Sequence, residues 1–233
     1  MIPPLDNPIW SSLTGLHAEF AHGGERLKMY PMEMAPFAAV PASGILAASL
    51  LDVTMAGREF VYFVGTLPSI DGAGFTVEPH PNILQMVCTE LRPAPKEASA
   101  VVEPLDASHV PAMLELMERV YPAYFRARTI EMGAYAGIFH GSDLVAMAGL
   151  RMAPQGFREI SGVCTDPRYA GRGLGGALVA HLARGVRAEG MTPMLHQDLD
   201  NTRARRLYEG LGFVVRTELP MFGIRRLAGK CDF

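Results

Sequence analysis

The stretch from residue 159 to residue 176 constrains the fold of this chain more than any other. Its first half, residues 160–165, is rich in apolar and β-branched side chains and favours a strand. Asp166-Pro167 ends that strand, because proline cannot donate a hydrogen bond to a sheet. Four glycines follow, at positions 171, 173, 175 and 176, and apolar residues four apart, from Leu174 to Val186, predict a helix after them. The sequence therefore predicts a strand, a glycine-rich turn and the start of a helix.

This order of elements is typical of an anion site. The first N–H groups of a helix have no acceptor within the helix, and the helix dipole adds partial positive charge at the same end. Glycine lets the backbone approach a ligand closely, because it has no Cβ. We therefore expect the turn to bind a pyrophosphate or a similar anion.

Composition limits the classes of protein that fit. A chain of 233 residues with 49% hydrophobic residues can form one large domain or two smaller ones with full cores. The net charge of −3 gives no support for nucleic-acid binding or for a polybasic face on a membrane. Residues 34–51 carry no charge, but prolines, serines and a glycine interrupt them, so we expect core rather than a membrane span.

The cysteines and the first residues indicate a cytoplasmic protein. Cys88, Cys164 and Cys231 are odd in number and far apart, which favours reduced thiols. The sequence begins Met-Ile-Pro-Pro-Leu-Asp, without the basic and apolar regions of a signal peptide.

The first half of the chain is rich in proline and shows no catalytic spacing. We expect a helix over residues 9–20, a strand over 60–64 and a last strand over 83–91. Its histidines are isolated in the sequence, so no metal site is expected. Alternating prolines in residues 92–99 indicate a stiff linker. The predicted domains are therefore residues 1–98 and 99–233.

The second half alternates strands and helices. We expect a first edge strand at residues 101–102 and a helix capped by Asp106 or Ser108. A second short helix is expected to begin at residues 124–128. Later strands are expected at 135–140, 144–152, 159–165, 192–197, 213–215 and 221–224, with helices over 174–190 and 201–211.

Three known motifs compete for the glycine-rich turn. Its glycines satisfy the Rossmann pattern G-x-G-x-x-G, but five residues separate them from the strand, and too little chain follows for a dinucleotide fold. A P-loop would end in Gly-Lys-Ser/Thr, which is missing here. The run Arg168-x-x-Gly171-x-Gly173 resembles the Q/R-x-x-G-x-G/A acyl-CoA motif of the GNAT (GCN5-related) N-acetyltransferases.

A second motif supports this resemblance. Residues 201–213, Asn-x-x-Ala-x-x-Leu-Tyr-x-x-x-Gly-Phe, are similar to the later half of the GNAT signature. The two motifs and the order of elements cover about 130 residues and resemble a bacterial subgroup with an N-terminal extension. The resemblance implies an α/β fold with a mixed, largely antiparallel central sheet flanked by helices, preceded by a smaller α/β domain. Whether that smaller domain is a degenerate GNAT half is left open.

The resemblance also implies a binding site for acetyl-CoA, without a metal. The strand around Val163 would bind the pantetheine arm through its backbone, and the amides of the turn would hold the pyrophosphate. Arg172 would meet the 3′-phosphate or stay solvated. The implied binding residues are Val163, Cys164, Thr165, Arg168, Ala170, Gly171, Arg172, Gly173, Leu174, Gly175, Gly176, Asn201, Ala204 and Tyr208.

The same resemblance suggests catalytic roles. Tyr208 would give its proton to the departing CoA sulfur, although the ring could also be a core aromatic. Glu159 stands where many relatives keep a general base, and a surface strand residue paired with Arg158 or Arg151 is the alternative. His196 is the reserve base. Cys164 is interpreted as a packing residue, because direct transfer needs no covalent intermediate.

The implied function is an acyl-CoA-dependent N-acyltransferase that moves acetyl directly to a primary amine. The expected acceptor is a small metabolite or an amino-acid-like molecule, and the expected state is a monomer or a homodimer. Alternatives are a non-catalytic acyl-CoA sensor and an acetyltransferase for protein N-termini or lysines.

Overall fold

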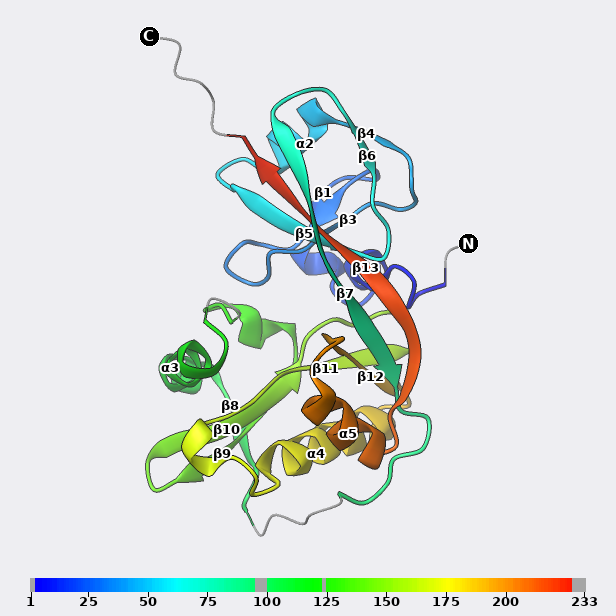
Figure 1. Cartoon of the computed structure of the whole chain (residues 1–233). Coiled ribbons are helices and arrows are strands. Elements are labelled where there is room, and N and C mark those ends of the chain that lie inside the picture. Colours follow the sequence, from blue (N-terminus) through cyan, green and yellow to red (C-terminus); the bar gives the residue numbers. More distant parts are fainter. Residues whose placement is uncertain (1–2, 95–99, 123–124, 228–233) are drawn as a thin grey trace. The chain divides into compact units, whose positions relative to one another are not determined.

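The computed structural model of the chain describes residues 3–94, 100–122 and 125–227 (Figure 1). The chain forms two compact units. The first contains Met1–Ile83, Ala153–Gln155 and Glu218–Phe233, and the second contains Leu84–Met152 and Gly156–Thr217. These units differ from the predicted domains 1–98 and 99–233, because strands β7 (Phe75–Val87) and β13 (Val214–Arg226) each contribute residues to both units.

The first unit is built from short elements. Strands β1, β2 and β3 form a small antiparallel sheet, β4 and β6 pair in parallel, and β5 pairs antiparallel with residues 221–225 of β13. Buried apolar side chains around Phe63 form its core. Its further elements are α1 (Pro8–Leu13), η1 (Ala18–Phe20), β1 (His22–Gly23), β2 (Lys28–Met29), β3 (Ala38–Ala39), β4 (Ile45–Ala47), α2 (Ala48–Thr54), β5 (Phe60–Val64) and β6 (Ser69–Asp71).

The second unit contains the larger sheet. Strands β8, β9, β10 and β11 pair antiparallel with their neighbours, β11 pairs in parallel with β12, and the end of β7 follows β12. Its further elements are β8 (Glu103–Leu105), η2 (Ala107–His109), α3 (Val110–Val120), η3 (Thr129–Met132), β9 (Tyr135–His140), β10 (Asp143–Leu150), β11 (Phe157–Thr165), η4 (Pro167–Tyr169), α4 (Leu174–Ala188), β12 (Thr192–Asp198) and α5 (Thr202–Gly210).

Helices cover both faces of this sheet. Leu178, Val179 and Ala183 of α4 pack with Ala146 and Ala148 of β10 in one core. Tyr208 of α5 and the C-cap residue Leu211 belong to the same core. Met113, Leu116 and Met117 of α3 pack with Leu144 and Met147 in the other core. From Ala146 to Ala148, successive residues of β10 enter opposite cores, as side-chain alternation along a strand requires. This architecture confirms the predicted mixed, largely antiparallel sheet flanked by helices.

Several predicted elements have different bounds. The two final strands are one continuous strand, β13, because Pro220 keeps its place in the ladder by accepting a hydrogen bond from Gly65 N through its carbonyl oxygen. The helix expected over 9–20 ends at Leu13, the strand expected at 83–91 is the end of β7, and the edge strand begins at Glu103.

Two expectations fall partly on undescribed positions. Residues 95–99 of the linker and residue 124 of the short helix lie outside the described residues. Within the described part of the chain, no helix is long and apolar enough to cross a membrane. The same residues contain no group of three or more side chains able to hold a metal ion.

Candidate active site

Strands β11 and β12 separate at the centre of the second unit. Their parallel register joins Phe157 to Thr192 and ends where Glu159 faces Met194. Both strands continue beyond this point, β11 to Thr165 and β12 to Asp198. The two parallel strands therefore separate beyond Glu159, and the sheet opens between them.

A bulge shapes β11 beside this opening. Ser161 pairs with Gly149 and Cys164 with Met147, so two residues of β11 lie opposite the single residue Ala148 of β10. Gly162, inside the bulge, has φ +61°, a conformation that favours glycine. The bulge presents the backbone of residues 161–164 to the space between the strands.

The glycine-rich turn has the predicted conformation. Gly171 and Gly173 have φ near +80°, and Gly173 is the N-cap of α4. The first intrahelical hydrogen bond runs from Ala177 N to Gly173 O. The N–H groups of residues 174–176 precede it, so they lie where a helix binds an anion.

A cavity of about 420 Å³ lies along this turn, and we call it the loop cavity. Twelve of the fourteen predicted binding residues line it, which fits a long ligand with a diphosphate at the helix end. Its lining consists of Val120, Tyr121, Val163, Cys164, Thr165, Tyr169, Ala170, Gly171, Gly173, Leu174, Gly175, Gly176, Asn201, Arg203, Ala204, Leu207 and Tyr208.

Arg168 and Arg172, the other two predicted residues, are not part of that lining. Arg168 donates from Nε and Nη2 to both carboxylate oxygens of Asp166, at 3.0 and 2.8 Å. Arg119 of α3 also binds this carboxylate, at 2.9 Å. Hydrogen bonds from Arg168 and the charges of both arginines lower the pKa of Asp166 to about 2. Arg172 lies over the ring of Tyr169, 4.8 Å from its centre.

A second cavity, of about 250 Å³, adjoins the first, and we call it the strand cavity. Its lining comes from both separated strands, from α5 with its N-cap, and from the end of α3. The two cavities share Tyr121, Val163, Asn201, Ala204 and Tyr208. The further lining residues of the strand cavity are Met117, Ile160, Ser161, Gly162, His196, Gln197 and Asp198.

Tyr208 and Asn201 thus lie where the cavities meet. Tyr208 is only 7% exposed, and its ring packs against Phe213 with centres 6.1 Å apart. The ring is therefore both a core aromatic and part of both cavity walls. The Asn201 side chain accepts a hydrogen bond from Ala204 N at 3.0 Å, so Asn201 is the N-cap of α5.

Glu159 is held in a buried ion pair. Arg151 donates to its two carboxylate oxygens at 2.7 and 2.9 Å, and Met152 N donates to one of them at 3.1 Å. Burial alone would raise the pKa of Glu159, but Arg151 and a hydrogen bond from His196 lower it far below its usual range. The alternative of pairing with Arg151 is therefore confirmed, although the pair is buried.

His196 continues this network. Its Nδ1 lies 2.8 Å from Glu159 Oε1, and its Nε2 lies 3.1 Å from Gln85 Nε2. Arg216 donates to Gln85 Oε1 at 2.8 Å. Because an arginine can only donate, the Gln85 amide nitrogen must donate to His196 Nε2, and Nδ1 then carries the His196 proton. Both ring nitrogens are engaged.

Cys164 is a packing residue. It is 3% exposed in the core beneath α3, and burial raises its pKa to about 12. A thiol with this pKa is not a nucleophile near neutral pH. Cys88 is likewise free and buried, and Cys231 lies outside the described residues.

Sequence reasoning missed several residues of the site. Tyr121 directly follows α3 and belongs to neither motif, and Gln85 lies in the half of the chain that shows no catalytic spacing. Gln197 lies in a predicted strand and belongs to neither motif. Arg203 could have been found, because it is a basic residue at the start of the helix that carries the second motif.

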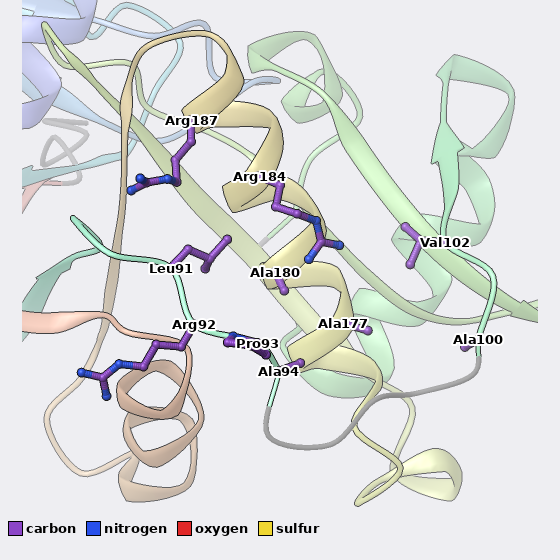
Figure 2. A pocket seen from close by; sticks show the side chains of 10 residues that line it. All are labelled: Leu91, Arg92, Pro93, Ala94, Ala100, Val102, Ala177, Ala180, Arg184 and Arg187. Carbon is purple, nitrogen blue, oxygen red and sulfur yellow. The ribbon is translucent and has the colours of Figure 1, made fainter.

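A third cavity of the second unit, of about 920 Å³, lies elsewhere (Figure 2). We call it the arginine cavity, since Arg92, Arg184 and Arg187 line it together with apolar side chains. It shares no residue with the loop and strand cavities. Figure 2 shows Arg184 and Arg187 extending from α4 to different sides, so these guanidinium groups do not converge. Residues 95–99, between two of its lining segments, lie outside the described residues, and we assign it no ligand.

Replacing Gly173 with Val is expected to abolish CoA binding. A β-branched residue is strained at φ +81°, and Gly173 is the N-cap of α4, so the strain falls at the start of the helix. Gly190→Val is the matched control, because Gly190 has φ +76° and its added Cβ would meet no atom within 4 Å. Calorimetric titration of CoA should show binding to the control only. Equal affinity in both variants would contradict the assignment of the turn.

Known proteins resemble the whole chain. Residues 135–220 match the family model described as FR47-like protein. A GNAT-family protein from Novosphingobium aromaticivorans DSM 12444 is 31% identical with a TM-score of 0.82, covering 97% of this chain and 99% of that chain. A GCN5-related N-acetyltransferase from Kribbella flavida is 16% identical with a TM-score of 0.64, covering 99% and 98%, which shows the fold alone. No curated protein matches significantly. With 31% identity over nearly the full length of both proteins, this chain belongs to the GNAT family of N-acetyltransferases.

Proposed function

We propose that the protein transfers an acetyl group from acetyl-CoA directly to the primary amine of a small molecule. The observation that carries this proposal is the meeting of two cavities at Tyr208 and Asn201. One cavity follows the glycine-rich turn, and the other is smaller and is lined in part by the separated strands. A donor and an acceptor could thus approach each other from opposite sides.

The loop cavity fits the donor. Backbone N–H groups at the start of α4 would hold the pyrophosphate, and Arg203 would add positive charge. The β11 backbone at Val163–Thr165 would bind the pantetheine arm as an added strand, because its pairing with β12 has already ended at Glu159. Acetyl-CoA supplies an activated acyl thioester when bound there.

The shared wall fits the proton donor. We assign that role to Tyr208, because its ring forms part of both cavities at the place where a thiolate would leave. The buried Cys164 thiol has no part in the reaction, so attack by the amine on the acyl carbon is direct.

Glu159 acts as a positioning residue in this proposal. Its carboxylate is engaged by Arg151, Met152 N and His196, and its low pKa makes it a poor acceptor for a proton. It fixes the ring of His196, which lines the strand cavity. We propose that water takes the proton of the acceptor amine. The free, buried thiols of Cys88 and Cys164 fit a cytoplasmic location.

Release of CoA thiol from acetyl-CoA, with a panel of primary amines, tests this function. The panel should contain small amines, amino-acid amides, a peptide with a free N-terminus and a lysine-containing peptide blocked at its N-terminus. We expect amine-dependent thiol release with the small amines. Tight CoA binding without acylation of any amine would indicate a sensor, and activity only on a peptide would indicate a protein acetyltransferase.

A further inference from the structure

Gln197 of β12 is the one side chain of the strand cavity with both polar atoms buried and unsatisfied among the described residues. The residue is 8% exposed. Its amide nitrogen and its amide oxygen are both enclosed, and neither has a hydrogen-bond partner in the described part of the chain. Buried amides in folded proteins nearly always have hydrogen-bond partners, so an amide without any calls for an explanation.

The chemistry of the Gln197 amide limits which groups can form hydrogen bonds with both of its polar atoms. Nε2 needs an acceptor and Oε1 needs a donor. A carboxylate offers acceptors only, and an ammonium offers donors only, so each would leave one atom of Gln197 unmatched. A carboxamide or a peptide-type amide presents a donor and an acceptor in one plane and can pair with both atoms.

The neighbouring charges also favour a neutral group. Asp198 follows Gln197 and lines the same cavity, whereas the described lining contains no lysine or arginine. His196 is engaged through both ring nitrogens by Glu159 and Gln85. A substrate carboxylate would therefore be repelled by Asp198, and no lysine or arginine of the described lining would offset this repulsion. A neutral amide would not be repelled.

We propose that Gln197 binds a neutral amide group of a substrate in the strand cavity. This inference rests on the proposed function and narrows its substrate. The amide has two chemical sources, an acceptor that carries an amide beside its amine and the pantetheine arm of the donor, which contains amides of its own. Since Tyr208 lies at the wall of the same cavity, either source would place its amide close to the reacting groups.

The test uses Gln197→Met in the full-length protein, because methionine has a similar shape and lacks strong donors and acceptors. Gln155→Met, at an exposed position that lines neither cavity, is the matched control. Binding of glycinamide and of propylamine, which lacks the amide, is measured by ligand-observed NMR with the protein saturated with CoA. Calorimetry measures CoA itself and adenosine 3′,5′-bisphosphate, which has no pantetheine arm.

We expect the wild-type protein to bind glycinamide about tenfold or more tightly than propylamine, and Gln197→Met to lose this preference. That result assigns the acceptor as the source of the amide. A tenfold loss of CoA affinity with unchanged adenosine 3′,5′-bisphosphate affinity assigns the pantetheine arm. The thermal stability of Gln197→Met should match or exceed the wild type, because a buried unpaired amide is removed.

Unchanged affinity for both CoA and glycinamide would overturn the inference. An equal loss of affinity for adenosine 3′,5′-bisphosphate would also overturn it, since that ligand has no pantetheine arm that could reach Gln197. Binding is measured without turnover, so the outcome does not depend on the proposed reaction. Amide binding that depends on Gln197, in a protein that acetylates no amine, would leave this inference intact and reject only the proposed function.

Discussion

Tyr208→Phe is expected to lower the turnover number by on the order of 10² or more, with nearly unchanged CoA affinity. The change removes only the hydroxyl that we assign as the proton donor, and the ring keeps its packing against Phe213. Steady-state thiol release gives the turnover number, and calorimetry gives the affinity.

Two further variants make this result interpretable. Tyr62→Phe, in strand β5 of the first unit, tests whether loss of any tyrosine hydroxyl has such an effect, and it should retain full activity. Tyr121 lines both cavities as Tyr208 does. A fully active but less stable Tyr208→Phe protein would show that its hydroxyl is structural. Loss of turnover in Tyr121→Phe instead would move the proton donor to Tyr121.

Glu159→Ala is expected to lower the free energy of unfolding by about 3–5 kcal/mol, because it leaves the buried Arg151 guanidinium without its partner. Urea unfolding at neutral pH measures this change. Replacing both residues, as Arg151→Met with Glu159→Leu, should cost less than the single change, since no buried charge remains unpaired. A loss below about 1 kcal/mol in Glu159→Ala would contradict a structural role for this pair.

The pH dependence of stability provides an independent check on Glu159. Its folded pKa lies below the value of 4.5 that an unperturbed glutamate has. The stabilisation from its ionised form is therefore complete above pH 4.5 and is lost as the pH falls towards the folded pKa. The wild type should thus lose more stability than Glu159→Gln over this acidic range.

Local patterns in the sequence predicted most of the second unit. Strands β9, β11 and β12 and helices α3, α4 and α5 lie where periodicity, glycines and caps placed them, because these signals act within a few residues. The long strands β7 and β13 were not predicted at their full length. Pro79, Pro81 and Pro220 interrupt the pattern locally, whereas pairing with distant strands decides that these segments stay extended.

The candidate site shows the same difference between features set by local sequence and features set by distant residues. The two motifs predicted the lining of the loop cavity, because glycines and helix caps report their own backbone geometry. The partners of Glu159 could not be predicted in full: Arg151 is eight residues away, but Gln85 reaches His196 across 111 residues of chain. Arg168 fits the motif by residue type. Its side chain, however, pairs with Asp166 and does not line the loop cavity.

A crystal structure of the protein with CoA tests the central claim most directly. We expect the pyrophosphate at the amides of residues 170–176 and the sulfur at the junction of the loop and strand cavities, beside Tyr208. The arginine cavity offers a larger space with three cations. CoA bound there, with the loop cavity occupied by no part of it, would contradict the assignment of the donor site and of Tyr208.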